Sequence, residues 1–133
     1  MSEAVITESL ELVAERGGDP TPQVYERVFA AYPEMKALFV LDRDDSAKGN
    51  MLAEFIECIL DLSGSRSYAK GLIQTEMINH ANLGVPPEVF GTFLSTIRDV
   101  FRDIGGEGWT PAMDEAWDGL ITEFEELLAE QAA

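Results

Sequence analysis

Apolar residues recur at helical spacing along almost the whole chain, and no segment alternates between apolar and polar positions with a period of two. The clearest stripe follows Thr110-Pro111, where a capping residue precedes proline at the first helical position. A second stripe begins after Pro86-Pro87-Glu88 and ends at Gly105-Gly106. The second stripe comprises Val89, Phe93, Ile97, Val100, Phe101 and Ile104, and the final one comprises Met113, Ala116, Trp117, Leu120, Ile121, Phe124, Leu127 and Leu128. We predict an all-α fold in which these two helices pair as an antiparallel hairpin.

The same spacing predicts five earlier helices, over residues 3–15, 21–32, 33–39, 45–62 and 68–82. Gly17-Gly18 ends the first of them, Thr21-Pro22 begins the second, and Pro33 redirects the chain after it. The polar run Asp42-Arg43-Asp44-Asp45 is expected to connect the third helix to the fourth. We find no internal repeat, low-complexity tract or second domain, so residues 1–133 are predicted to form one domain of about seven helices.

Composition narrows the classes of function and partner. Nine Lys and Arg residues against 25 Asp and Glu give a net charge of −16, which disfavours nucleic acid and anionic membrane surfaces as partners. No apolar run approaches the roughly 20 residues of a membrane span, and the amino terminus does not resemble a secretion signal. We therefore expect a cytoplasmic protein. Cys58 is the only cysteine, so no internal disulfide can form, and its apolar neighbours predict a buried, inert thiol.

His80 is the only histidine, and a lone histidine on a helix is more often a structural residue than a metal ligand. Its neighbours change that expectation. The run Asn79-His80-Ala81-Asn82-Leu83-Gly84-Val85-Pro86-Pro87-Glu88 places the imidazole near a helix end, before a sharp corner and a new helix. Three other segments occur in a matching order: Tyr25 to Phe39 with its proline at position 33, Lys48 to Leu52, and Trp109-Thr110-Pro111 with Ala116-Trp117. Together, from about Val24 to Leu128, they resemble the bacterial single-domain globins and the globin domain of flavohaemoglobins.

The resemblance implies a globin fold around haem b (iron protoporphyrin IX), with His80 as the proximal iron ligand. Tyr25 matches the distal tyrosine of many bacterial globins, whose hydroxyl donates a hydrogen bond to bound dioxygen. The alternative for Tyr25 is a core tyrosine that bonds a backbone carbonyl. An axial sulfur from Cys58 or one of the five methionines is a further alternative that the resemblance does not place. The apolar walls would be Phe39, Leu52, Val85, Phe90 and Phe93, which are equally compatible with an ordinary core.

Two positions depart from the family pattern. Lys48 stands where globins more often have histidine or glutamine, and we expect its ammonium to meet a haem propionate, with Arg43, Arg66 and Lys70 as rival partners. Phe90 stands where flavohaemoglobins have a tyrosine that supports the proximal histidine. Glu76 lies one turn before His80, where its carboxylate could accept the second ring proton and orient the imidazole, or it could simply face solvent.

The leading functional hypothesis is a haem-binding globin that reversibly binds a diatomic gas (O2, NO or CO) as a carrier, a scavenger or a protein of nitric oxide detoxification. Catalysis of nitric oxide dioxygenation, or weak peroxidase activity, would need a separate reductase, because the chain has no flavin or nicotinamide module. One alternative is a haem-free or haem-sensing globin-fold regulatory or interaction protein. Another is a purely structural helical module in which His80 is incidental. Fold alone does not choose among these functions.

Overall fold

The computed structural model describes residues 2–39, 41–42 and 46–132, and these contain helices and no strand. The α-helices are α1 (Ser2–Gly17), α2 (Thr21–Ala31), α3 (Ser46–Ser63), α4 (Ala69–Asn82), α5 (Pro87–Gly105) and α6 (Pro111–Ala132); the short 3-10 helices are η1 (Pro33–Phe39) and η2 (Gly106–Gly108). Each predicted helix is confirmed, and its predicted first residue lies within two positions of the first residue of the observed helix. The short helix predicted over residues 33–39 has 3-10 geometry, in keeping with the proline at its start.

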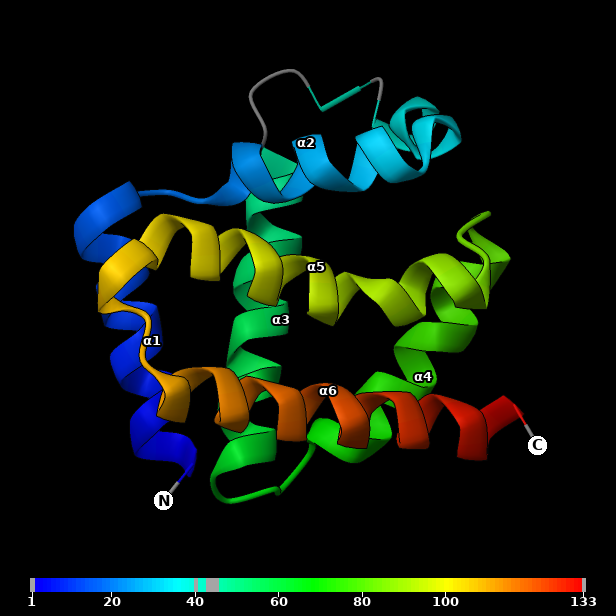
Figure 1. Cartoon of the computed structure of the whole chain (residues 1–133). Coiled ribbons are helices and arrows are strands. Elements are labelled where there is room, and N and C mark those ends of the chain that lie inside the picture. The colour runs from blue at the N-terminus through cyan, green and yellow to red at the C-terminus, as the bar shows by residue number, and fades with distance from the viewer. Residues whose placement is uncertain (1, 40, 43–45, 133) are drawn as a thin grey trace.

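The last two helices form the predicted hairpin. Figure 1 shows α5 and α6 running in opposite directions, joined by η2, with α3 crossing behind them. The α2 helix lies over α5, α1 covers one end of the hairpin, and α4 lies at the other end. Gly106 at the carboxyl end of α5 has φ of 54°, a backbone conformation that glycine adopts without strain and that lets the chain turn back.

The core lies between the hairpin and the helices that cross it. Its largest fully buried side chains are Trp117, Phe101 and Phe124. The Trp117 indole Nε1 donates a 2.9 Å hydrogen bond to the Ser9 hydroxyl, which in turn donates to the Ile6 carbonyl oxygen at 2.6 Å. This chain of bonds satisfies the buried polar atoms that attach α6 to α1.

A buried carboxylate fixes the start of α4, the helix that carries His80. Asp61, near the end of α3, accepts hydrogen bonds from the backbone N–H groups of Ser67, Tyr68 and Ala69 at 2.8–3.0 Å. Burial raises the pKa of Asp61, but these bonds together with one from the Ser67 hydroxyl outweigh burial and hold the pKa well below its usual range. Asp61 thus caps α4 from the preceding helix.

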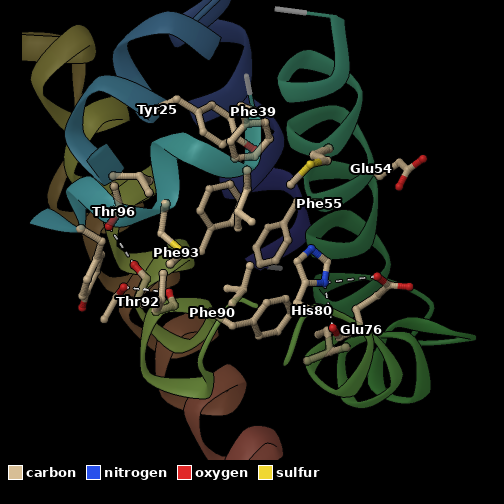
Figure 2. A pocket seen from close by; sticks show the side chains of 18 of the residues that line it. Tyr25, Phe39, Glu54, Phe55, Glu76, His80, Phe90, Thr92, Phe93 and Thr96 are labelled. Atoms are coloured by element: carbon tan, nitrogen blue, oxygen red, sulfur yellow. Dashed lines mark hydrogen bonds and ion pairs between the residues drawn. The ribbon is translucent and has the colours of Figure 1, made fainter. Parts of the chain in front are cut away.

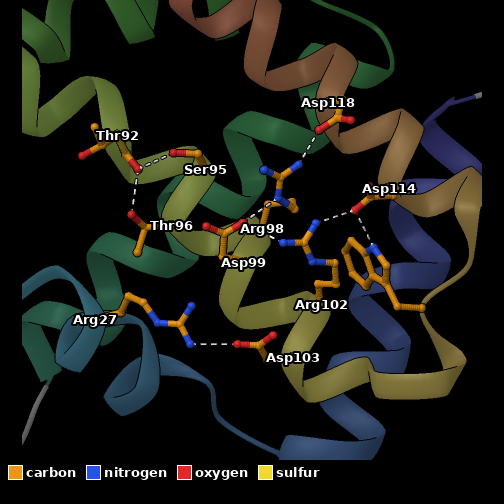
Figure 3. Close-up of polar contacts among 11 residues, drawn as sticks. Arg27, Thr92, Ser95, Thr96, Arg98, Asp99, Arg102, Asp103, Asp114 and Asp118 are labelled. Atoms are coloured by element: carbon orange, nitrogen blue, oxygen red, sulfur yellow. Dashed lines mark hydrogen bonds and ion pairs between the residues drawn. The ribbon is translucent and has the colours of Figure 1, made fainter. Parts of the chain in front are cut away.

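Ion pairs on the outer side of α5 connect it to α2 and α6 (Figure 3). Arg27 of α2 pairs with Asp103 at 2.8 Å, and Arg102 pairs with Asp114 of α6 at 3.1 Å. Arg98 pairs with Asp99 beside it and with Asp118 of α6. Most of these side chains are substantially exposed, so each pair contributes at most about 1 kcal/mol. Among the described residues no helix is long and apolar enough to cross a membrane.

Candidate functional site

A cavity lies between α2, η1, α3, α4 and α5, and its lining is mainly aromatic and aliphatic (Figure 2). His80 enters it from α4, while Tyr25 and Phe39 enter from α2 and η1. The remaining walls come chiefly from α3 and α5, and Val85, in the corner between α4 and α5, closes one side. Residues that are far apart in the sequence therefore meet around one apolar space.

The His80 ring is held by its neighbours so that one nitrogen remains for a ligand. Its Nδ1 lies 2.8 Å from the backbone carbonyl oxygen of Glu76 and 3.5 Å from a carboxylate oxygen of the same residue. The Phe90 ring packs against the imidazole with a centroid separation of 5.0 Å. Within the described part of the chain, no hydrogen bond is found at Nε2. With the proton on Nδ1 donated to the carbonyl, Nε2 presents a lone pair that can bind a metal.

A row of aromatic rings connects the His80 end of the cavity to the Tyr25 end. Successive centroid separations are 5.0–5.9 Å, and the order is His80, Phe90, Phe124, Phe55, Phe93, Tyr25 and Phe39. Such contacts between tilted or edge-on rings stabilise the row and exclude water from the cavity. The site therefore has an imidazole at one end, a phenol at the other and apolar surface between them.

Tyr25 carries a buried hydrogen-bond donor that has no partner. The residue is 3% exposed, and its hydroxyl is the only buried side-chain N or O atom among the described residues that lacks a hydrogen bond. Burial, and then the negative charge of Asp42, raise the pKa of the phenol, so it stays protonated. An unsatisfied buried donor costs free energy unless a ligand supplies an acceptor. This hydroxyl is suited to hydrogen-bond a small polar ligand within the cavity.

Most of the residues predicted for the site line this cavity. They are Tyr25, Phe39, Glu76, His80, Val85, Phe90 and Phe93. Leu52 does not, because it is buried in the core at 2% exposure. Lys48 is also outside the lining: its Nζ lies 2.9 Å from an Asp42 carboxylate oxygen and 5.1 Å from the centre of the Phe39 ring.

The rival cations predicted for a propionate are not brought to the cavity either. Arg66 forms an ion pair with Glu123 of α6, and Lys70 is exposed on α4 outside the lining. Arg43 lies outside the described residues. The carboxylates that line the cavity are those of Glu54 and Glu76. No lysine or arginine of the described segments accompanies them.

Lys48 and Leu52 of α3 are predicted from the sequence to face the site. The structure shows that a neighbouring face of this helix lines the cavity. Met51, Glu54, Phe55 and Cys58 line the cavity instead. The spacing of Met51, Phe55 and Cys58, at i, i+4 and i+7, was the signal in the sequence that could have identified this face.

The start of α3 explains this orientation. The Asp42 carboxylate accepts hydrogen bonds from the backbone N–H groups of Ala47 and Lys48 and also binds the Lys48 ammonium, which holds that side chain away from the cavity. Cys58 is 5% exposed, and burial followed by the charge of Asp61 raises the pKa of its thiol to about 11. The predicted burial of the thiol is confirmed, and the raised pKa keeps the thiol in its less nucleophilic protonated form.

These residues fit a haem group in chemistry. A free imidazole nitrogen, aromatic walls and an orphaned buried donor match what iron, a porphyrin plane and a bound polar ligand require. His80 would hold the iron, and Phe39, Val85, Phe90 and Phe93 would pack on the ring. Glu54 and Glu76 would repel the propionates, so these would have to point away from both carboxylates.

Comparison with known proteins gives one match. No curated protein and no solved structure matches the chain. The family model described as Globin matches residues 22–128, which extend from the start of α2 to near the end of α6 and include every residue that lines the cavity. The chain is therefore a member of the globin family and has the all-α globin fold that its sequence predicts.

Proposed function

We propose that this globin binds haem b through His80 and reversibly binds a diatomic gas, such as dioxygen, nitric oxide or carbon monoxide, in the cavity between α3, α4 and α5. Haem iron held by one imidazole keeps its opposite axial position open to such a gas. The observation that carries the proposal is the placement of the His80 Nε2 and the buried Tyr25 hydroxyl, neither with a hydrogen-bond partner in the described part of the chain, at opposite ends of one aromatic row.

The residues around His80 set its orientation. The Glu76 carbonyl accepts the Nδ1 proton, which directs Nε2 toward the cavity, and the Glu76 carboxylate at 3.5 Å adds a weaker attraction. Phe90 packs against the ring and prevents it from turning. We infer that Glu76 and Phe90 replace the tyrosine-based proximal support of flavohaemoglobins in this chain.

The Tyr25 hydroxyl acts at the other end of the site. Because it is buried and stays protonated, it can donate a hydrogen bond to a polar gas and slow the release of that gas. Phe29, Phe39 and Phe93 surround the ring and keep water away from it. Lys48 reaches a haem propionate only by exchanging its contact with Asp42.

The test is titration of the purified protein with haemin. We expect a sharp Soret band at one haemin per chain, with that band lost or shifted in His80→Ala. Asn79→Ala, which changes the neighbouring exposed side chain, is the matched control and should bind haemin like the wild type. A protein that takes up no haemin contradicts the proposal.

A second measurement tests the distal assignment. Tyr25→Phe should speed dioxygen dissociation by roughly two- to tenfold, which corresponds to a net hydrogen bond of about 0.5–1.5 kcal/mol. Stopped-flow displacement of dioxygen by carbon monoxide measures this rate. An unchanged rate would remove Tyr25 from the distal site while leaving haem binding intact.

One observation favours a second candidate function. The two carboxylates in the cavity lining, with no described cation beside them, oppose the propionates and fit a haem-free globin-fold regulatory protein. The same titration separates the two candidates, because the second requires the absence of haemin uptake.

If haem is bound, a further experiment separates nitric oxide dioxygenation from carriage and scavenging. The gas-loaded protein, with a reductant in place of the separate reductase, should convert nitric oxide to nitrate only in the first case.

A further inference from the structure

The cavity contains several atoms that can donate an electron pair to haem iron from the side opposite His80. They belong to Tyr25, Tyr32, Met35, Met51, Glu54, Cys58, Thr92 and Thr96. The question is therefore which of these side chains, if any, would bind the iron before a gas does.

The hydroxyl and thiol donors are poor candidates. Burial raises the pKa of the Tyr25 phenol and of the Cys58 thiol, so neither supplies an anion near neutral pH. The hydroxyls of Thr96 and Thr92 donate to the Thr92 and Val89 carbonyl oxygens at 2.8 and 2.9 Å and are weak neutral donors. The Tyr32 phenol lies two turns beyond Tyr25, past the carboxyl end of α2, and is partly exposed to solvent. Lys48 lies outside the lining and its ammonium pairs with Asp42.

The carboxylates are placed unfavourably for this role. Glu76 lies on the same helix as His80, one turn before it, and its carboxylate is beside Nδ1 rather than across the cavity. Glu54 is exposed, and Figure 2 shows its carboxylate turned away from the aromatic row. The thioethers of Met35 and Met51 remain. A thioether needs no proton loss to bind iron, and histidine with methionine is an established pair of haem ligands.

The position of Met51 on α3 favours it over Met35. Lys48, three residues earlier, lies beside Phe39, and Phe55, one turn later, packs on Phe93 at 5.0 Å. Phe55 also packs on Phe124 at 5.5 Å, in the middle of the row. Met51 therefore lies between Lys48 and Phe55 along α3, nearer than Phe55 to the Tyr25 and Phe39 end of the row. The Met51 side chain is half-buried, whereas Met35, on η1, is only 7% exposed. A ligand that must swing aside for a gas needs this freedom.

We propose that the Met51 thioether occupies the sixth position of the haem iron when no gas is bound, and that a gas enters by displacing it. The inference rests on the proposed haem function and adds to it that the Met51 thioether competes with the gas for the iron. The exchange moves one sulfur lone pair off the iron and one gas lone pair onto it, with no change in electron count. The apparent gas affinity is the intrinsic affinity multiplied by the fraction of chains in which the position is free.

The experiment compares the haemin-loaded wild type with Met51→Leu and with Met35→Leu, a matched change of a neighbouring methionine in the same cavity. The wild type should be six-coordinate and low-spin in both oxidation states. Its ferric form should show the red charge-transfer absorption of thioether-ligated haem, and its ferrous form the strongly upfield methyl resonance of a bound methionine. Met51→Leu should lose both signals, and Met35→Leu should keep both.

Gas binding supplies a second readout. Carbon monoxide should bind the ferrous Met51→Leu protein about tenfold faster than the wild type if Met51 holds the position for nine-tenths of the time. Leucine is close in volume to methionine, and a circular dichroism spectrum like that of the wild type shows that the variant is folded.

The possible failures are distinct. A wild type that binds haemin through His80 but is five-coordinate or water-ligated overturns the Met51 assignment and leaves the proposed function intact. Persistence of the thioether signals in Met51→Leu, or their loss in Met35→Leu, also overturns it. Failure to bind haemin overturns the proposed function and this inference with it.

Discussion

At the scale of single residues, the buried hydroxyl of Tyr25 opposes the stability of the fold, because it has no hydrogen-bond partner among the described residues. Removing it should remove an unsatisfied donor from the haem-free protein, so Tyr25→Phe is expected to raise the free energy of unfolding by roughly 1 kcal/mol. Urea denaturation of the haem-free chain measures this. Tyr68→Phe is the control, because the Tyr68 hydroxyl is half-exposed and already bonds the Glu57 carbonyl oxygen. A Tyr25→Phe protein no more stable than the wild type would mean that the hydroxyl has a partner in solution.

The contact between Glu76 and His80 gives a second prediction at this scale. The short bond from Nδ1 goes to the backbone carbonyl, which Glu76→Gln keeps, while the carboxylate is 3.5 Å away and 39% exposed. We expect Glu76→Gln to change haemin affinity by no more than about fivefold, the size of an exposed ion pair of about 1 kcal/mol. Competition for haemin with a second haem-binding protein measures the change. A loss of a hundredfold or more would show that the carboxylate itself orients the imidazole.

At the scale of secondary-structure elements, Asp61 controls how α4 begins. In the folded protein its pKa lies below that of a free carboxyl group, so its negative form stabilises the fold above about pH 4, and this stabilisation is lost as the pH falls below that value. Asp61→Asn should therefore lower the melting temperature at pH 7, and the difference from the wild type should shrink in acid. Thermal unfolding followed by circular dichroism at pH 7 and near pH 3 tests this. Asp103→Asn, which removes an exposed pairing partner, should have a smaller effect at pH 7.

The elements also show what sequence reasoning could and could not predict. Helix positions followed from apolar stripes and from Gly and Pro boundaries, because these depend on nearby residues alone. The rotation of α3 about its axis could not be predicted in this way. This helix has apolar residues on two adjacent faces, one with Leu52 and Ile59 and one with Met51 and Phe55. The contact between Asp42 and Lys48 fixes the face that meets the cavity, and it depends on a turn whose geometry the pattern does not encode.

The site shows the same division. The resemblance pointed to His80 and Tyr25, which lie on recognisable segments at family spacing, and both of them line the cavity. It did not identify the Glu76 backbone carbonyl as the short contact of Nδ1, because the sequence displays side chains rather than carbonyl directions. Nor did it reveal that the Tyr25 hydroxyl lacks a hydrogen-bond partner among the described residues, which depends on the packing of Phe29, Phe39 and Phe93 around the ring.

At the scale of the whole molecule, the net charge of −16 should make stability depend on salt. Screening weakens the repulsion among carboxylates, and it also weakens the exposed ion pairs of α5, which contribute little each. Repulsion is the larger effect, so we expect the melting temperature to rise between low ionic strength and about 1 M sodium chloride, where the screening length falls to about 3 Å. Differential scanning calorimetry at constant pH measures this rise.

A charge variant provides the control for the salt prediction. Glu125, Glu126 and Glu130 are exposed near the carboxyl end of α6, where negative charge also opposes the helix dipole. Replacing all three with glutamine should raise the melting temperature at low salt and reduce its rise with added salt. A melting temperature that falls with salt in both proteins would show that the ion pairs outweigh the repulsion.

The single thiol, Cys58, provides a built-in chemical probe, because its rate of labelling reports how often the cavity opens. Because this sulfur is 5% exposed and lines the cavity, a disulfide reagent reaches it only when the cavity opens, and with no other cysteine in the chain every labelling event reports that opening. The labelling rate of the folded protein, divided by that of the unfolded chain, is then the fraction of time the cavity is open. A ligand that fills the cavity should slow the reaction in proportion to its occupancy, so the protein can report its own loading without any colour change.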